Sequence, residues 1–354
     1  MLGEIGLQQG RLHQAEQSYR QLLVSAKGNP VDQMAAQLGM AKVFYEWNHL
    51  AEAEQSVAQV LELGKAHLDE LGTYFVEVGF LFPAELLQAR LSQARGEYAQ
   101  AQQLLQQLQT FAQKHQLTAL SQIALAQQVE LALASGLLPS VEDWQATSPD
   151  EAASVMQQER EDLLRARVLI ARGEITEALR LLGNWQEEAR TWRRLRSELE
   201  ILVLQSLAYA ASSRPVQARQ ALKEALLLAQ PEGFQRLFLE KGEQLFTLLR
   251  TLFLDLREEP HVRYARGLLL AFASLKGEPQ DAPHAASVLL LEPLTEAEQR
   301  VLDLLVRGHT NPEIAAALVV SINTFKTQVQ SIYRKLDVKN RWEAKEAARR
   351  LDLL

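Results

Sequence analysis

Polar and basic side chains gather on one face of a segment near the end of the chain, residues 321–336. If this segment is a helix, one face carries Asn323, Lys326, Thr327, Gln330, Ser331 and Arg334. Amide side chains can pair with adenine edges, Arg with guanine, Thr with a thymine methyl or a phosphate, and Lys with phosphates. Residues 321–341 contain five basic residues and one acidic residue, a local charge of +4. The segment therefore has the side-chain chemistry of a DNA contact.

The same segment has an apolar stripe that would fix its orientation. The stripe consists of Ile322, Phe325, Val329, Ile332 and Leu336. At 100° per residue these positions fall within about 80° of one another, so they would pack against neighbouring helices. Ser321 precedes the segment and is expected to cap a helix that continues to about Leu336. The alternative is a polar face that is only solvated.

Two shorter helices are predicted just before this segment. Thr295 and Glu298 form a Thr-x-x-Glu capping box, which predicts a helix that runs to about Arg307 and ends at Gly308. Its inward stripe would be Val301, Leu302 and Leu305, and that of the next helix Ile314, Ala315 and Leu318.

The second helix has two candidate starts. Asn311 could cap it with Pro312 at the first helical position, or Thr310 and Glu313 could form another capping box. Two helices joined by so short a turn are typical of the helix-turn-helix, which places the second helix of the pair in the major groove. The successive caps favour DNA contact over a merely solvated face.

These residues resemble the LuxR-type family of response-regulator effector domains. The matching positions are Leu294, Thr295, Glu298, Val301, Leu302, Leu305, Gly308, Asn311, Glu313, Ile314, Ala315, Leu318, Ser321, Thr324, Lys326, Ile332, Lys335, Leu336, Val338, Arg341 and Ala344. The resemblance implies a helix-turn-helix over 311–330 and a fourth helix, from about Asn340, that supports dimerisation on DNA. It also adds Thr324 and Lys335 to the expected DNA-binding residues.

The chain departs from the usual pattern of that family at several positions. Ala297 stands where Arg is usual, Phe325 where Val is usual and Gln328 where His is usual. In the fourth helix, Lys345 replaces an apolar residue beside an unusual Trp342. The resemblance therefore implies the fold and the mode of binding, but not the base preference.

The preceding residues show apolar side chains at helical spacing to about Leu275, which predicts an all-α body. One cassette recurs: a small or polar residue, then an alanine five positions later, then apolar residues four and seven further on. The copies begin at Gly10, Asn48, Gly96, Gly173 and Ser213, with anchors at Ala15, Ala53, Ala101, Ala178 and Ala218, and a weaker copy runs from Gly136 to Val141. A helical bundle yields some matches by chance, but five copies in near-register favour repeats.

The anchors lie 37 to 48 residues apart, the length of a helical hairpin, so six hairpins stacked into a solenoid with a concave surface are predicted. The cassettes resemble tetratricopeptide repeats, and their irregular period resembles the repeat domain of the large MalT-like regulators. Residues 276–293 contain prolines and a glycine without apolar periodicity in their first half, which indicates a linker. The expected domains are a repeat domain over 1–275 and a DNA-binding domain over 294–354.

Composition excludes several other functions. The chain of 354 residues has no cysteine, which excludes a disulfide framework, thiolate zinc sites and a catalytic thiol. It contains no His-Glu-x-x-His pair and no Gly-x-Ser-x-Gly elbow, so we expect no enzyme activity and no metal. Regulators of this class usually carry an ATPase domain, but no phosphate-binding Gly-x-x-x-x-Gly-Lys loop is present, so we expect no nucleotide cofactor. Met1 falls almost inside the first hairpin, so we expect a fragment or a truncated reading frame.

Charge and hydropathy indicate the compartment and the partners. The net charge is −7, and residues 294–354 carry ten Lys/Arg against eight Asp/Glu, which leaves −9 on the preceding body. An acidic body repels nucleic acid, so DNA must be bound by a local basic face. No apolar run is long enough for a membrane span, and a cytoplasmic protein of bacterial origin is expected.

The sequence therefore predicts a sequence-specific transcription regulator. Its partners would be double-stranded DNA, a second copy of itself on DNA, and RNA polymerase as a further candidate. The repeat domain would sense a small-molecule or protein effector or mediate assembly. The alternative is a protein-interaction scaffold whose helix-turn-helix is an ancillary docking module.

Overall fold

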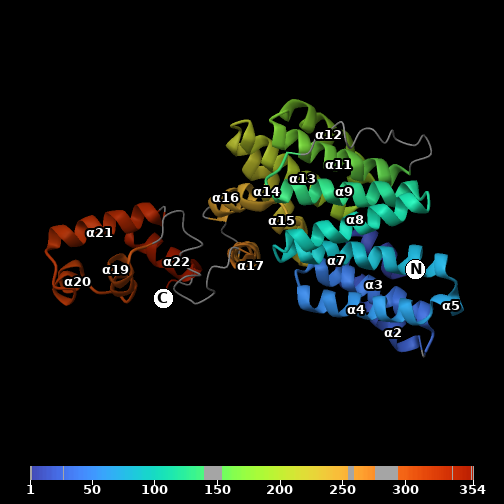
Figure 1. The fold of residues 1–354 in the computed structure, drawn as a ribbon. Coiled ribbons are helices and arrows are strands. Elements are labelled where there is room, and N and C mark those ends of the chain that lie inside the picture. Colours follow the sequence, from blue (N-terminus) through green and yellow to red (C-terminus); the bar gives the residue numbers. More distant parts are fainter. Residues whose placement is uncertain are drawn as a thin grey trace. The chain divides into compact units, whose positions relative to one another are not determined.

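The computed structural model describes residues 2–26, 28–138, 154–253, 259–275, 294–336, 338–351 and 353. These residues form helices joined by turns and short irregular segments, and no strand occurs among them, so the predicted all-α class is confirmed. The chain forms two compact units, Met1–Gly242 and Glu243–Leu354, which Figure 1 shows in blue to yellow and in orange to red. None of the helices in the described part of the chain is long and apolar enough to cross a membrane.

The first unit is built from paired helices (Figure 1). The pairs are α1 (Leu2–Gln9) with α2 (Leu12–Ser25), α3 (Pro30–Glu46) with α4 (Leu50–Ala66), α7 (Phe82–Ala94) with α8 (Tyr98–Lys114), α11 (Val155–Arg172) with α12 (Ile175–Thr191), and α13 (Leu195–Ala211) with α14 (Pro215–Ala229). The remaining elements are α5 (Leu68–Leu71), α6 (Thr73–Val76), the π-helical turn η1 (Glu77–Leu81), α9 (Thr118–Ala134), the 3₁₀ turn η2 (Gln230–Glu232) and α15 (Arg236–Leu239).

The predicted repeat cassette matches these pairs. Each anchor alanine lies near the start of the second helix of a pair and is fully buried: Ala15, Ala53, Ala101, Ala178 and Ala218. The residue that opens each cassette has a positive φ, 75° at Gly10, 62° at Asn48, 80° at Gly96, 82° at Gly173 and 57° at Ser213. The left-handed conformation makes the tight turn between the helices, and Gly and Asn adopt it at low cost. In the weaker copy Gly136 has a φ of 75°, while Val141 lies outside the described residues.

Close approach between the first two hairpins depends on Tyr19. The Tyr19 ring lies against Gly3 of α1 and Gly39 of α3, where a Cβ would overlap it. Its hydroxyl donates a hydrogen bond to Glu4 Oε2 at 3.1 Å. Burial is the main cause that raises the pKa of Tyr19, and the Glu4 carboxylate adds to it. The two glycines therefore let α1, α2 and α3 pack around one aromatic ring.

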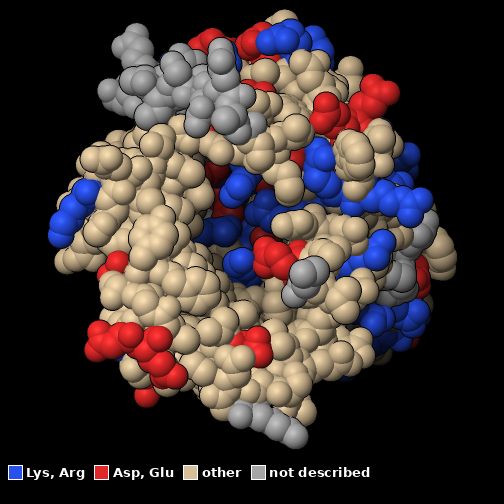
Figure 2. Space-filling view, turned by 90° about the vertical axis from the view of Figure 1, so that its right-hand side faces the viewer, with Lys and Arg blue, Asp and Glu red and all other residues tan. Residues whose placement is uncertain are grey.

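The last helices of the first unit contact its first helices. Helix α1 contacts α13, and α15 contacts α3. The Gln235 amide donates to the Glu46 carbonyl at 2.8 Å, and Trp47 Nε1 donates to the Glu232 carbonyl at 2.8 Å. The segment after α14 therefore lies against the second hairpin, and the unit encloses its concave side, which appears as a hollow in Figure 2.

The second unit contains the predicted DNA-binding helices. It comprises α16 (Gly242–Phe253, from the unit boundary), α17 (Glu259–Leu275), α19 (Glu296–Val306), α20 (Asn311–Ala317), α21 (Ile322–Lys335) and α22 (Arg341–Leu351). Phe246 of α16 and Phe272 of α17 are in contact, with ring centroids 5.6 Å apart. The predicted linker, residues 276–293, lies outside the described residues, so the predicted limits of the two domains stay predictions.

Candidate nucleic-acid interface

The helices of the second unit begin where their caps predict. Thr295 and Glu298 form a capping box in which the Thr295 amide donates to Glu298 Oε2 at 2.7 Å. At α20 the second alternative is the observed one: Thr310 is the N-cap, and its amide donates to Glu313 Oε2 at 2.7 Å. Asn311 and Pro312 are the first two residues of that helix. Each box satisfies backbone donors that a helix start leaves without partners.

The turn between α20 and α21 is short. The amides of Val319 and Val320 donate to the carbonyls of Ala316 and Ala315 at 3.2 and 3.0 Å, which closes the end of α20. Val319 has a φ of 54° and is 91% exposed. The Ser321 hydroxyl then accepts from the Thr324 amide at 3.1 Å and caps α21. Helices α20 and α21 contact each other, so together they form the predicted helix-turn-helix.

The inward face of α21 is largely the predicted one. Phe325, Ile332 and Leu336 are buried, and Val329 is half-buried. Ile322 was expected in this stripe, but it is 41% exposed, so that prediction is wrong. Ile322 is the first residue of α21. The neighbouring helices that cover the middle of α21 do not cover this first residue.

Six of the eight predicted DNA-binding residues are exposed. They are Asn323, Thr324, Lys326, Thr327, Gln330 and Arg334. They point away from the buried stripe, and the Thr327 hydroxyl donates to the Asn323 carbonyl at 3.1 Å. Thr324 also shares its hydroxyl with Ser321 Oγ at 2.8 Å. The exposed face thus presents amide, hydroxyl, ammonium and guanidinium groups at once.

The other two predicted residues, Ser331 and Lys335, face α19. Lys335 Nζ donates to Glu298 Oε2 at 2.7 Å, and the two side chains are 11% and 8% exposed. Burial acts to raise the pKa of Glu298, but hydrogen bonds from Lys335, Thr295 and Ser331 lower this pKa to about 2. The carboxylate is therefore charged at neutral pH and holds α21 against the start of α19. Nothing in the spacing of the sequence signals this pair, because its members are 37 residues apart.

A shallow groove beside α21 adds three residues that are not among the predicted DNA-binding residues, Thr295, Glu298 and Gln328. It is lined by Thr295, Glu298, Asn323, Thr324, Thr327, Gln328 and Ser331. Gln328 Oε1 is buried and has no hydrogen-bond partner among the described residues. Thr295 marks the N-terminus of α19, where the capping box with Glu298 already satisfies backbone amides. The groove therefore extends the polar face of α21 towards a second helix start.

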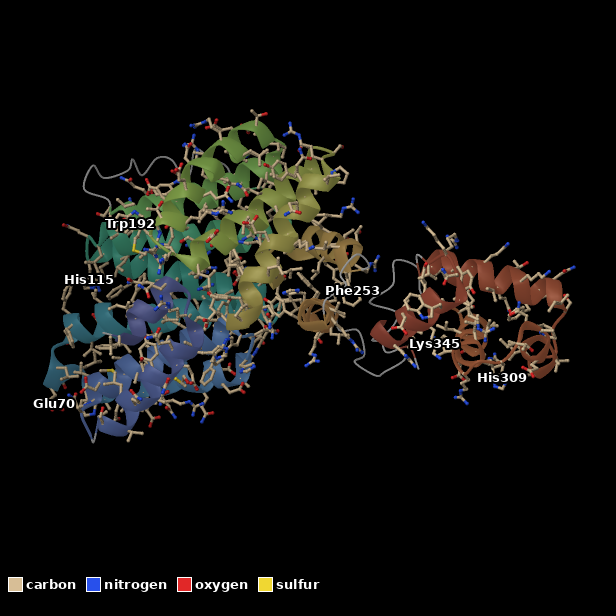
Figure 3. The ribbon with its side chains drawn as sticks, turned by 180° about the vertical axis from the view of Figure 1, so that it is seen from behind. Glu70, His115, Trp192, Phe253, His309 and Lys345 are labelled. Atoms are coloured by element: carbon tan, nitrogen blue, oxygen red, sulfur yellow. The ribbon has the colours of Figure 1, made fainter. Side chains whose placement is uncertain are left out.

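Helix α22 is hydrogen-bonded to the last turn of α19 and to the loop that follows it. Arg341 donates to the carbonyls of Leu305 and His309, at 2.7 and 2.5 Å. Figure 3 labels His309 in that loop and Lys345 on α22. Trp342 of α22 is 71% exposed, and Lys345 is half-buried. The helix thus packs on one side and presents a large aromatic side chain to solvent on another.

Comparison with known families agrees with this architecture. Residues 1–254 match the family model of the MalT-like tetratricopeptide repeat (TPR) region, and residues 292–348 match that of the bacterial regulatory proteins of the luxR family. The chain belongs to the MalT-like TPR family and carries a luxR-type unit after its repeats. The resemblances stated from the sequence are confirmed.

Known relatives match across both units. They include the HTH-type transcriptional regulators MalT of Vibrio cholerae (26% identical over 331 residues), Yersinia enterocolitica (29% over 342) and Yersinia pestis (30% over 342). Each match covers 88% of this chain and 35% of the relative. The chain thus spans about a third of the length of these relatives. They are named as transcriptional regulators and not as enzymes, and no cluster of metal-binding side chains occurs among the residues described here.

Proposed function

We propose that the chain is a sequence-specific DNA-binding transcription regulator in which α21 enters the major groove. The observation that carries this proposal is the exposed polar face of α21 opposite the buried Phe325 and Ile332. A helix that follows a short turn in this way can insert into the groove while its partner helix lies across the backbone. The names of the bacterial relatives support a regulator, and we place its activity in the cytoplasm, with the DNA.

The side chains of α21 divide by chemistry. Gln330, Arg334 and Asn323 can form paired hydrogen bonds with base edges and would carry sequence preference. Lys326, Thr324 and Thr327 would bind phosphates, which position the protein without reading sequence. We assign Ser331 and Lys335 to the contact with Glu298, because both face that carboxylate. They would orient α21 rather than touch DNA.

The second candidate function is the protein-interaction scaffold. It is supported by the first unit, whose repeats enclose a concave side as protein-binding solenoids do. The two functions differ in their response to salt. Binding to duplex DNA releases counterions, so a protein that contacts several phosphates loses affinity steeply between about 50 and 200 mM salt. Docking of a protein partner to the repeats would change little over the same range.

Fluorescence anisotropy of the whole chain with a labelled random-sequence duplex separates the two. A regulator gives a linear fall of log affinity against log salt, with a slope of about −0.9 for each phosphate contacted. A further duplex, selected for tight binding, should bind more strongly at every salt concentration. Weak binding that is independent of salt would favour the scaffold.

We also propose that two copies act together on DNA. One helix-turn-helix covers only about 600 to 1,000 Å² of protein surface, too little for tight binding, so paired half-sites are expected. The exposed Trp342 on α22 supports a contact between two copies, and RNA polymerase is a further candidate partner. Binding of the whole chain to duplexes with one or two half-sites tests this: the duplex with two should bind cooperatively, and Trp342→Glu should abolish the cooperativity.

A further inference from the structure

Ile322 is an apolar residue exposed at the start of the proposed DNA-binding helix. It is the first residue of α21 and is 41% exposed. The residues next to it in the chain and one turn further on are exposed and polar: Ser321, Asn323, Thr324 and Lys326. An apolar side chain therefore interrupts the otherwise polar surface of the first turn of α21.

The start of α21 does not depend on Ile322. The Ser321 hydroxyl caps the helix and accepts from the Thr324 amide at 3.1 Å. The two positions of a hydrophobic staple, which fixes how the chain enters a helix, are Val320 and Phe325, and these are half-buried and buried. A β-branched residue is also a weaker helix former than a straight-chain one. Capping, packing and helix propensity thus give no reason for an isoleucine at this position.

Ile322 lies between the buried stripe and the exposed face of α21. At about 100° per residue it is about 40° from Lys326 on the exposed face and about 60° from Phe325 in the stripe. Helices α19 and α20 contact α21, and both lie below it in Figure 1. Phe325 is 1% exposed, whereas Ile322 is open to solvent. Its side chain is therefore on the same side of the helix as Lys326, which we assign to a phosphate.

The major groove of DNA offers one group that suits such a side chain. When a helix-turn-helix docks, the N-terminal residues of its second helix contact base edges. Isoleucine neither donates nor accepts a hydrogen bond, so it cannot bind a phosphate or the polar atoms of a base. The apolar group on the floor of the major groove is the C5-methyl of thymine, which apolar side chains contact. Such a contact removes apolar surface from water and so favours binding.

We propose that Ile322 contacts the C5-methyl group of a thymine and is a specificity-determining residue of α21. This inference rests on the proposed function, in which α21 enters the major groove. It adds an apolar contact to the hydrogen bonds assigned to Asn323, Gln330 and Arg334. The thymine would lie where the start of α21 meets the groove, next to the base pair that Asn323 contacts.

Two other exposed residues near Ile322 carry methyl groups. Thr327 is exposed, and its hydroxyl donates to the Asn323 carbonyl at 3.1 Å. Its single methyl group offers less apolar surface than the side chain of Ile322. Val319 is 91% exposed, but it lies in the turn before α21, whereas base edges are contacted by residues of the helix itself. A test must therefore separate Ile322 from Thr327 and Val319.

The test uses the whole chain and a duplex selected for tight binding to it. Each thymine of the duplex is replaced in turn by uracil, which lacks the C5-methyl group but keeps the same hydrogen-bonding groups. Affinity is measured by fluorescence anisotropy at one salt concentration. We expect one replacement in a half-site to weaken binding about three- to fivefold, the effect of losing about one buried methyl group. Ile322→Ser should bind the thymine and uracil forms of that duplex equally well.

Thr327→Ser and Val319→Ser are the matched controls, because each removes apolar surface from an exposed residue close to Ile322. Both should keep the preference of the wild type for thymine over uracil at the sensitive position. Ile322→Val covers the case in which Ile322→Ser does not fold: it keeps a branched apolar side chain, so it should retain a reduced preference for thymine. Circular dichroism of each variant checks that the helices are formed.

The outcomes separate this inference from the proposed function. Selective binding in which no replacement of thymine by uracil changes the affinity would overturn the role of Ile322 and leave the regulator in place. A preference that persists in Ile322→Ser, or that is lost in Thr327→Ser or Val319→Ser, would overturn it as well. If the chain binds no duplex more tightly than random DNA, the proposed function fails, and the role of Ile322 fails with it.

Discussion

Glu298 Oε2 lies 2.7 Å from Lys335 Nζ and also 2.7 Å from the Thr295 amide nitrogen. One buried carboxylate therefore starts α19 and holds the end of α21 against it. The orientation of the exposed face of α21 depends on this contact, although neither Glu298 nor Lys335 needs to touch DNA. Stability and DNA affinity should thus be coupled at Glu298.

Glu298→Gln should destabilise the second unit in a pH-dependent way. The pKa of Glu298 is lowered in the folded protein to about 2, so the carboxylate stabilises the fold above its unfolded pKa and this stability is lost as pH falls. At pH 7 the lost stabilisation should be about 3 kcal/mol at most. Calorimetry of both chains should show their difference in stability shrinking between about pH 5 and pH 2. A constant difference across that range would contradict the charged role of Glu298.

Lys326→Ala should weaken binding to every duplex by a similar factor. The exposed ammonium is assigned to a phosphate, and a phosphate contact carries no sequence information. The salt slope should fall by about 0.9, as measured by anisotropy from 50 to 200 mM salt. Arg349→Ala is the control, since Arg349 lies on α22 and pairs with Glu346. A changed base preference with an unaltered slope would refute the phosphate assignment.

Gly39→Ala should destabilise the first unit by about 1 to 3 kcal/mol, because the added methyl would overlap the packed Tyr19 ring. Gly183→Ala in α12 is the matched control: nothing lies within 4 Å of a Cβ there, so better helix propensity should leave stability unchanged or raise it. Chemical denaturation followed by circular dichroism measures both. Equal stability of the two variants would show that the ring moves away freely.

Val319→Gly should stabilise the second unit. Val319 is a β-branched residue with a φ of 54°, and the left-handed region costs such a residue about 1 to 2 kcal/mol that glycine does not incur. Its side chain is 91% exposed, so little packing is lost. A higher midpoint of thermal unfolding is expected. A lower midpoint would mean that the Val319 side chain makes stabilising contacts.

Local signals in the sequence predicted the elements well. The caps at Thr295 and Ser321 and the residues that open the turns, Asn48 among them, act within a few positions of the chain. Ile322 was assigned to the core because the apolar spacing of α21 includes its first residue. Whether that residue is buried depends on which other helices pack against it, and the spacing does not show this. The pairs Glu298–Lys335 and Arg90–Glu240 join residues 37 and 150 positions apart, and no local pattern predicts such contacts.

We expect α21 to read base sequence. Selection of bound duplexes from a random pool by the whole chain, repeated with Gln330→Ala and Arg334→Ala, tests it most directly. One enriched sequence is expected for the wild type. In each variant the preference should relax at one or two base pairs, by about 1 to 3 kcal/mol each. A wild-type pool without any shared sequence, or variants that bind every duplex more weakly but select the same sequence, would contradict it.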